Sequence, residues 1–229
     1  MMTRAHQLSA VARARRAREK TARRDSILAA ACETFTSRGF AGSTMEDVAL
    51  RAEITKPTLY GYFRTKDELL LSLMLPVFVD IGTQLEQLQS DLETGAVEDR
   101  EDLVTKFLDA VLFPYRRDPE RFRLTQLLHQ TRLVESLDAE VLSQLDTQGR
   151  HDFATARSIL KRAMRLRIIR DVPVAPLADV IWGIVVGTIQ VEDIKNRTGG
   201  RAQLAATVQL AADLLSYALT PHTQENDHQ

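Results

Sequence analysis

The chain has 229 residues, 44% of them hydrophobic, which is enough for one large domain or two small ones with a sizeable core. Its net charge is only −1 at pH 7, yet residues 1–68 are basic and the remainder is acidic. This asymmetry indicates a nucleic-acid or membrane partner for the basic part. The single cysteine, Cys32, excludes an intramolecular disulfide framework and a multi-cysteine metal cluster, and it is typical of a reducing cytoplasm.

Neither a secretory signal nor a membrane span is expected from this sequence. The N-terminus lacks the apolar segment of a signal peptide, although its Arg-rich, acid-poor start is also typical of an organellar transit peptide. The longest apolar stretch, residues 180–191, is bounded by Asp179 and Glu192 and is too short to span a bilayer. We therefore expect a cytoplasmic protein with no membrane partner.

Apolar residues three and four apart predict helices almost throughout, and no run of alternating apolar and polar residues indicates a strand. Residues 1–22 are predicted to form a basic, flexible arm that is helical near its end. Its candidate DNA contacts are Arg13, Arg15, Arg16 and Arg18. They would neutralise phosphates or enter the minor groove. A solvated tail that gives only non-specific attraction is the alternative.

Three short helices are predicted after the arm. The first covers roughly residues 23–37. The second begins at Ser43 or Thr44, and Thr44 with Asp47 has the spacing of a capping box, with Asp in place of Glu. The third follows a short turn and is capped by Thr55, which can accept a hydrogen bond from a free backbone N–H.

The third helix has two different faces. On a wheel of about 100° per residue, Leu59, Tyr62 and Phe63 share the face that should pack on the first two helices. The outward side carries Lys56, Pro57, Thr58, Tyr60, Gly61 and Arg64. A short helix set across another by a tight turn, with an outward polar face, is a helix-turn-helix, whose second helix enters the DNA major groove.

The run FTSRGFAGSTMEDVALRAEITKPTLYGYFRTKDELL resembles the N-terminal signature of the TetR family of transcriptional regulators over about residues 24–70. Twelve positions have its characteristic spacing: Phe35, Gly39, Phe40, Thr44, Val48, Ala49, Ala52, Leu59, Tyr60, Phe63, Lys66 and Leu69. One position departs from it, because Glu53 stands where the family usually has glycine at the turn. A non-glycine residue there costs up to ~1 kcal/mol if its backbone is left-handed.

The resemblance implies roles for individual residues of the head. Thr44, Tyr60 and Lys66 should contact phosphates, and Lys66 also lies where the free N–H groups of a helix start favour an anion. The residues expected to face base edges are Lys56, Pro57, Thr58 and Gly61. Thr55 and Arg64 complete the predicted DNA-binding set. The alternatives are that both tyrosines complete a small core and that Lys66 is a solvated lysine.

The rest of the chain is predicted to form further helices. One should start at residues 65–66 and run past Leu85, with a kink or break near Leu75 caused by Pro76. By resemblance, this helix links the DNA-binding head to an effector body, and the kink is a candidate hinge. The other predicted helices cover residues 99–112, 119–134, 139–166, 176–196 and 201–219.

The last two predicted helices are the most apolar. The first of them is apolar nearly all round and must be covered on both sides. In the family, two such helices from each subunit form a four-helix dimer interface, which by resemblance would involve Ile184, Gly187, Val191, Val208, Ala211 and Leu215. The alternative is an ordinary core within a monomer.

The body should also hold a pocket between its helices for a small hydrophobic or aromatic effector. Candidate lining residues are Phe78, Phe107, Leu127, His129, Met164, Trp182 and Val186. The alternative for each of them is that the side chain only packs in the core. His129 would then be a structural histidine whose hydrogen bonds are satisfied within the protein.

No enzyme motif is present: the sequence lacks a Gly-rich phosphate loop, HExxH, GxSxG and any Cys/His metal pattern. We therefore expect no catalysis, cofactor or metal. The prediction is an all-α, homodimeric regulator with a helix-turn-helix head (23–66), a helical effector-binding and dimerisation body (67–220) and a polar tail (221–229). It would repress transcription from a palindromic operator in the nucleoid until a hydrophobic effector releases it.

Two alternatives to this reading stay open. The first is a DNA-binding regulator or architectural protein that acts through a protein partner and has no small-molecule effector. A helical interaction protein whose head has lost DNA binding is the second alternative, although Lys56, Tyr60 and Lys66 argue against it.

Overall fold

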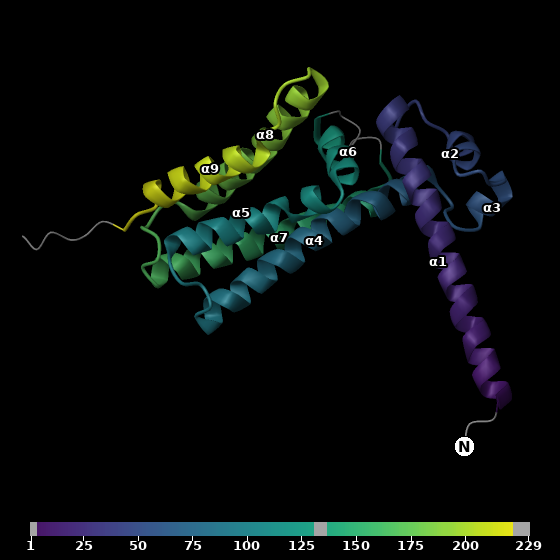
Figure 1. Cartoon of the computed structure of the whole chain (residues 1–229), viewed down its shortest axis with the longest axis horizontal. Coiled ribbons are helices and arrows are strands. Elements are labelled where there is room, and N and C mark those ends of the chain that lie inside the picture. Colours follow the sequence, from purple (N-terminus) through teal and green to yellow (C-terminus); the bar gives the residue numbers. More distant parts are fainter. Residues whose placement is uncertain (1–3, 131–136, 222–229) are drawn as a thin grey trace, which may run out of the picture. The chain divides into compact units, whose positions relative to one another are not determined.

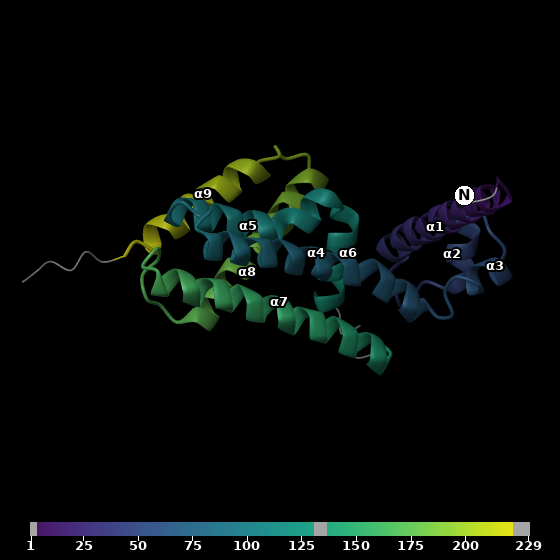
Figure 2. The same cartoon turned by 90° about the horizontal axis from the view of Figure 1, so that it is seen from below.

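The computed structural model describes residues 4–130 and 137–221, with side chains for 11–126 and 137–221. Within this part of the chain the secondary structure is entirely helical (Figures 1 and 2), which confirms the predicted fold class. The helices are α1 (Arg4–Arg38), α2 (Met45–Arg51), α3 (Lys56–Tyr60), α4 (Lys66–Thr94), α5 (Arg100–Arg117), α6 (Pro119–Gln130), α7 (Ala139–Arg165), α8 (Val174–Arg197) and α9 (Leu204–Ala218).

The chain divides into two compact units. We call the first, residues up to Val77 together with 118–145, the head unit, and the second, residues 78–117 and 146 onwards, the body unit. The division falls later than the boundary expected after residue 66, because the first turns of α4 pack with the head. The head unit also includes α6, which packs against α1.

The head unit is built around α1, which packs on α2 and α6, while α2 packs on α3. Its largest fully buried side chains are apolar and come from α1, α3 and the residues after it, the start of α4, and α6: Ile27, Phe35, Leu59, Phe63, Leu69, Leu70, Leu73 and Phe122. Phe35 and Phe40 meet edge to face, with ring centroids 5.2 Å apart. Burial of such side chains, at about 25 cal/mol per Å² of apolar surface, is what holds helices as short as α2 and α3 in place.

Helix α1 begins at Arg4, so the expected start near residue 23 is wrong. Residues 11–26 are exposed, and Ile27 is the first buried side chain of the helix. The N-terminal part is helical because alanine and arginine, which dominate it, are among the best helix formers and no glycine or proline interrupts them. Gly39, with a φ of 74°, ends the helix in the left-handed conformation that glycine adopts readily.

Two internal prolines do not end their helices. α4 runs unbroken from Lys66 to Thr94 through Pro76, so the predicted break near Leu75 is absent. α5 continues through Pro114 to Arg117, beyond its expected end at residue 112. A proline removes one backbone hydrogen bond, and the packing of the flanking turns, where Leu112 and Tyr115 are buried, offsets that loss.

In the body unit α5 packs against α8 and α9, and these two pack against each other. The C-terminal part of α4 joins α5 through a bidentate ion pair, in which Arg117 Nη1 lies 2.6 and 2.8 Å from the two carboxylate oxygens of Asp80. α7 contacts α8 through the edge-to-face pair Phe153 and Trp182, whose centroids are 5.9 Å apart. These contacts enclose an apolar core between α5, α7, α8 and α9.

By length and composition alone, two helices of the described chain could cross a membrane, α4 and α8. We expected the apolar stretch at residues 180–191 to be too short to span a bilayer. That expectation considered only part of the helix, because the helix around that stretch has 24 residues. The two helices differ in how well the protein covers them: 44% of the most apolar window is buried in α4 but only 22% in α8. An apolar face of α8 therefore remains uncovered in the single chain.

Candidate DNA interface and effector cavity

The helix-turn-helix is held by two capped helix starts, as predicted. Thr44 is the N-cap of α2, and its hydroxyl accepts the N–H of Asp47 at 3.1 Å while the Asp47 carboxylate accepts the N–H of Thr44 at 3.0 Å. Thr55 caps α3 by accepting the N–H of Thr58, and Pro57 lies in the first turn, where its missing N–H removes no helical bond. The geometry confirms both predicted caps.

The turn between the two helices is closed by a Schellman motif on a non-glycine residue. The N–H of Ile54 bonds the Ala49 carbonyl at 3.0 Å, and the N–H of Glu53 bonds the Leu50 carbonyl at 3.2 Å. Glu53 has a φ of 54°, so the left-handed backbone that the sequence resemblance implied at this position is present. The turn thus has the usual geometry with an unfavourable side chain.

The faces of α3 are placed as the helical wheel predicted. Leu59 and Phe63 are fully buried and Tyr62 is half-buried. The outward residues Lys56, Pro57, Thr58, Tyr60, Gly61 and Arg64 are all exposed. Tyr60, with 42% of its surface exposed, is not a core residue of the head, so its ring and hydroxyl are available to an external partner.

Several outward side chains have partners within the head. The Lys56 ammonium pairs with the Glu46 carboxylate on α2 and lies 5.9 Å from the centre of the Tyr60 ring. The hydroxyl groups of Thr55 and Thr58 are hydrogen-bonded at 2.8 Å. Both contacts are exposed, so exchanging them for contacts to a base is inexpensive compared with breaking a buried pair.

Thr44 is exposed, but its hydroxyl already donates to Asp47 Oδ2 at 2.8 Å. The hydrogen bonds from Thr44, together with Arg38, hold the pKa of the Asp47 carboxyl below its ordinary value. A phosphate contact from Thr44 therefore requires its hydroxyl to turn away from Asp47, and that contact stays a prediction.

Lys66 is not the solvated lysine of the alternative reading. Its ammonium donates to the carbonyls of Phe40 at 2.7 Å and Ser43 at 2.9 Å and lies 4.3 Å from the centre of the Phe40 ring. Since an ammonium has three N–H donors, at least two are used to hold the turn between α1 and α2. The predicted phosphate contact stays untested, while the structural role was missed because its partners lie more than 20 residues away in the chain.

The four predicted arm residues, Arg13, Arg15, Arg16 and Arg18, lie on the exposed N-terminal part of α1. They do not share one face of that helix. Arg15 pairs with Glu19 at 3.4 Å, and Arg18 donates to the Ala14 carbonyl at 3.4 Å.

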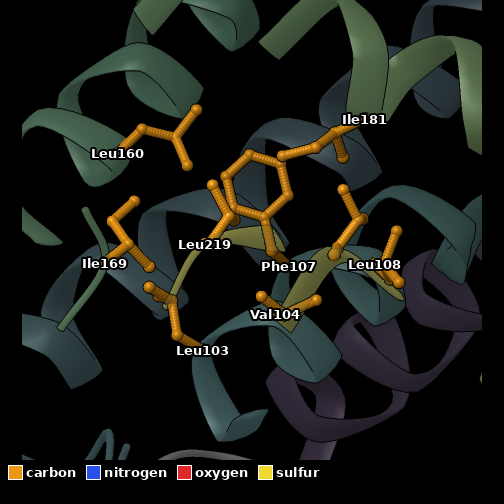
Figure 3. Close-up of a pocket in the computed structure, with 9 residues that line it drawn as sticks. Leu103, Val104, Phe107, Leu108, Leu160, Ile169, Ile181 and Leu219 are labelled. Carbon is orange, nitrogen blue, oxygen red and sulfur yellow. The ribbon is translucent and has the colours of Figure 1, made fainter. Parts of the chain in front are cut away.

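The body unit encloses a small apolar cavity between α5, α7, α8 and α9 (Figure 3). Its lining residues are Leu103, Val104, Phe107, Leu108, Leu160, Ile169, Ile181, Leu215 and Leu219. Figure 3 shows the Phe107 ring among the surrounding aliphatic side chains, with no polar atom on the labelled ones. Its free space fits about one water-sized sphere, so an effector of ordinary size needs the helices to move apart.

Only one of the predicted pocket residues, Phe107, lines this cavity. Phe78, Met164, Trp182 and Val186 are half-buried and do not line this cavity, so their place in an effector pocket stays a prediction. The side chains of Leu127 and His129 lie outside the described residues. The missed residues of α5 belong to a regular apolar stripe, but helical spacing shows only which side is buried and not where packing leaves a gap.

A buried carboxyl group lies between α4 and α7 in the same unit. Asp152 is 6% exposed; its Oδ1 accepts a hydrogen bond from Gln148 at 2.9 Å, and its Oδ2 has no partner among the described residues. Burial raises the pKa of Asp152 to about 6. A Cβ at Gly82 would lie 2.6 Å from Asp152 Oδ1, so the carboxyl occupies the space that only a glycine on α4 leaves open.

Helices α8 and α9 carry large apolar side chains on the surface of the unit. The exposed ones are Val180, Val191, Ile194, Leu210, Leu214 and Tyr217, the last with 84% of its surface exposed. Of the predicted interface residues, Val191 is exposed and Ile184, Gly187, Val208 and Ala211 are half-buried. Leu215 is buried in the single chain and lines the cavity, and its predicted place at the interface stays a prediction.

The chain resembles known regulatory proteins in both sequence and fold. Residues 27–73 match the family model described as bacterial regulatory proteins, tetR family. The HTH-type transcriptional repressor NicS of Pseudomonas putida is 28% identical over 156 residues, which cover 68% of this chain and 70% of NicS. The HTH-type transcriptional activator FasR of Mycolicibacterium smegmatis is 42% identical over 52 residues, 23% of this chain and 24% of FasR.

Among solved structures, the transcriptional regulator FadR from Bacillus subtilis in complex with stearoyl-CoA shares the fold. Its TM-score is 0.60 at 17% sequence identity, and the match covers 82% of this chain and 96% of that chain. At this sequence identity the likeness establishes the fold of the described helices and does not extend to the ligand.

Proposed function

We propose that the chain is a TetR-family transcriptional regulator, a homodimeric repressor that binds a palindromic operator in the nucleoid and is released by a hydrophobic effector; the match of residues 27–73 to the family model supports this. The observation that carries the DNA-binding part is the geometry of α3. Leu59 and Phe63 anchor it from behind, while its outward residues are exposed and polar or small. A helix built in this way fits the DNA major groove, which is about 12 Å wide.

The proposed contacts divide into two kinds. The side chains of Thr44, Tyr60 and Arg64 would contact phosphate oxygens. Lys56 and Thr58 would bond base edges, with the Pro57 ring against a thymine methyl group. Gly61 has no side chain, so it would let the backbone come close to the DNA; its φ of −70° shows that the turn itself does not require glycine.

The uncovered apolar face of α8 and α9 supports the dimer. Leu210, Leu214 and Tyr217 on α9 are each more than half exposed, as are Val180 and Ile194 on α8. Exposed apolar side chains gathered on two neighbouring helices are typical of an interaction surface in soluble proteins. A second copy seated on it by twofold symmetry would present two heads, so the operator would be an inverted repeat.

The apolar cavity of the body unit supports a hydrophobic effector. It is lined by carbon atoms alone, and FadR, which shares the fold, was solved with stearoyl-CoA. To release DNA, the effector must bind the DNA-incompetent state more tightly than the DNA-bound state. The 28% identity to a repressor over 68% of the chain favours repression, whereas the match to the activator covers only 23% of the chain.

The size of the cavity favours a second candidate, a regulator with no small-molecule effector that acts through a protein partner. Room for about one water is too little for a fatty or aromatic molecule. The two candidates share the DNA-binding head and differ only in what occupies the body.

The test of operator binding is capture of fragmented genomic DNA from the source organism by the purified protein, followed by fluorescence anisotropy at two salt concentrations. We expect one inverted repeat to bind at least ~10³-fold more tightly than random DNA, as specific regulators do. Equally weak binding to every fragment, lost as salt rises, would show that only phosphate attraction is present and would refute base reading by α3.

A further inference from the structure

The basic residues of the N-terminal part of α1 fall into two sets on the helix surface. On a wheel of about 100° per residue, one set spans a sector of roughly 100° and continues the face that Ile27 and Phe35 bury further along. This set, which we call the basic stripe, consists of Arg13, Arg16, Lys20, Arg23 and Arg24 and contains no acidic residue.

The opposite side of the helix is electrically balanced. It carries Arg15 and Arg18 together with Glu19 and Asp25, and Arg15 is paired with Glu19 at 3.4 Å. By contrast, no ion pair occupies Arg13, Arg16, Lys20 or Arg23 in the described part of the chain, and all four are exposed. The net positive charge of residues 13–25 is therefore concentrated on one side of the helix.

The stripe is fixed in direction relative to the head because α1 is one continuous helix. At its inner end, Arg24 donates to the Ser72 hydroxyl at 3.2 Å and lies 5.1 Å from the centre of the Phe63 ring, the residue that anchors α3. N-terminal to this point α1 projects past α2 and α3 (Figure 1). The stripe thus extends the side of α1 that faces the helix-turn-helix.

From this geometry we propose that the basic stripe binds the phosphate backbone of double-stranded DNA outside the operator half-site that α3 reads. From Arg13 to Arg23 the helix rises about 15 Å, the length of some four base pairs at about 3.4 Å each. A helix about 10 Å wide cannot enter a minor groove about 6 Å wide. The arm therefore contacts phosphates as a helix and reads no bases in the minor groove.

This proposal rests on the proposed operator binding. It distinguishes two pairs of arginines in the arm by their position on the helix, although both pairs carry the same charge. Replacing Arg13 and Arg16 by Ala removes two stripe charges per protomer, and replacing Arg15 and Arg18 by Ala removes two charges from the opposite face. The two variants lose the same residue type in the same number, so any difference between them comes from position on the helix.

The experiment measures the affinity of the full-length protein for duplexes that carry the selected inverted repeat, with and without about five flanking base pairs on each side. The flanks should tighten binding by the parent protein. In the Arg13→Ala/Arg16→Ala variant we expect this gain to vanish and the slope of log affinity against log salt to fall by about 3 to 4 per dimer, at about 0.9 per lost phosphate contact. The Arg15→Ala/Arg18→Ala variant should keep the flank gain.

A second variant tests whether the arm acts as a helix. Ala14→Gly with Ala17→Gly leaves every charge in place but lowers helix stability by about 1 kcal/mol per substitution. We expect this variant to lose most of the flank gain. A full gain in the glycine variant, or equal losses in the two arginine variants, would overturn the proposal.

The same salt slopes measured on a duplex of random sequence separate this proposal from the proposed function. If the parent selects no sequence, operator binding fails, yet the stripe variant must still show the smaller slope on random DNA. If the parent selects an inverted repeat but the two arginine pairs behave alike, only the basic stripe is refuted.

Discussion

Glu53 holds a backbone conformation that ordinarily belongs to glycine. Its φ of 54° is required because the turn between α2 and α3 closes through the N–H groups of Glu53 and Ile54. The side chain is exposed and contributes no described contact to offset the strain. The turn is therefore maintained by the packing of the helices on either side.

Replacing Glu53 by Gly should raise the free energy of unfolding by about 1 kcal/mol, because glycine adopts positive φ without a steric penalty. Urea unfolding followed by circular dichroism measures this change. Arg167→Gly is the companion variant, since Arg167 has a φ of 58° in the body unit and should respond alike. An unchanged or lower midpoint for both variants would mean that the greater freedom of glycine in the unfolded chain cancels the relief of strain.

Asp152 makes the stability of the body unit depend on pH. Burial raises the pKa of its carboxyl from 3.8 to about 6, so the folded protein holds a proton that the unfolded chain has released between these values. The stabilising effect of that proton is complete below about pH 4 and is lost as the pH rises through 6. At neutral pH the group is ionised and buried beside Gly82, with one oxygen unpaired.

Asp152→Asn removes this ionisation. We expect the variant to exceed the parent in free energy of unfolding at pH 7.5 by up to about 3 kcal/mol, following 1.36 kcal/mol per pKa unit, and to lose this advantage below about pH 4. Thermal melts across this range measure the difference. Asp109→Asn, in an exposed pair with Arg116, is the control and should show no such slope. Parallel curves for parent and Asp152→Asn would contradict the predicted pH dependence.

At the scale of elements, Lys66 connects the first residue of α4 to the turn that precedes α2. Its ammonium donates hydrogen bonds to two backbone carbonyl groups and makes a cation–π contact with the Phe40 ring. The helix that leads out of the head is therefore tied to the element that carries Thr44. Lys56, by contrast, pairs only with the exposed Glu46.

Lys66→Met keeps the length of the side chain and removes its hydrogen bonds. The variant should lose about 1.5–3 kcal/mol of stability, because hydrogen bonds to charged groups contribute about that much. Its affinity for DNA should fall with an unchanged salt slope if the role is structural, as read by anisotropy at several salt concentrations. A slope that drops by about 0.9 per protomer, with stability retained, would instead establish a phosphate contact. Lys56→Met is the matched control for stability and should leave it unaltered.

At the scale of the whole molecule, the proposed dimer would form through the exposed apolar side chains of α8 and α9. Leu214→Glu places a charge in that face and should convert the dimer to a monomer in sedimentation, because burying an unpaired carboxylate is strongly unfavourable. Leu50→Glu is the control for oligomeric state, since Leu50 is 80% exposed and belongs to α2 in the head unit. The monomer should bind the inverted repeat at least about ten-fold more weakly, having lost the second head. A Leu214→Glu protein that stays dimeric would place the interface elsewhere.

The sequence by itself determined the local features of this protein. The caps at Thr44 and Thr55 and the inward face of α3 all depend on residues within four positions of one another. Dihedral angles and hydrogen bonds at that range follow from side-chain chemistry alone. The helix-turn-helix, and the fold class with it, could therefore be predicted before any contact was known.

Only the tertiary structure decided the features that join distant parts of the chain. The partners of Lys66 lie 26 and 23 residues away, and the cavity gathers side chains from α5, α7, α8 and α9. Helical periodicity could not show that Leu215 turns into the cavity while Leu214 faces outward, because both belong to an apolar stripe. Which neighbour fills each space is settled by packing across the whole unit, and no stretch of sequence encodes that alone.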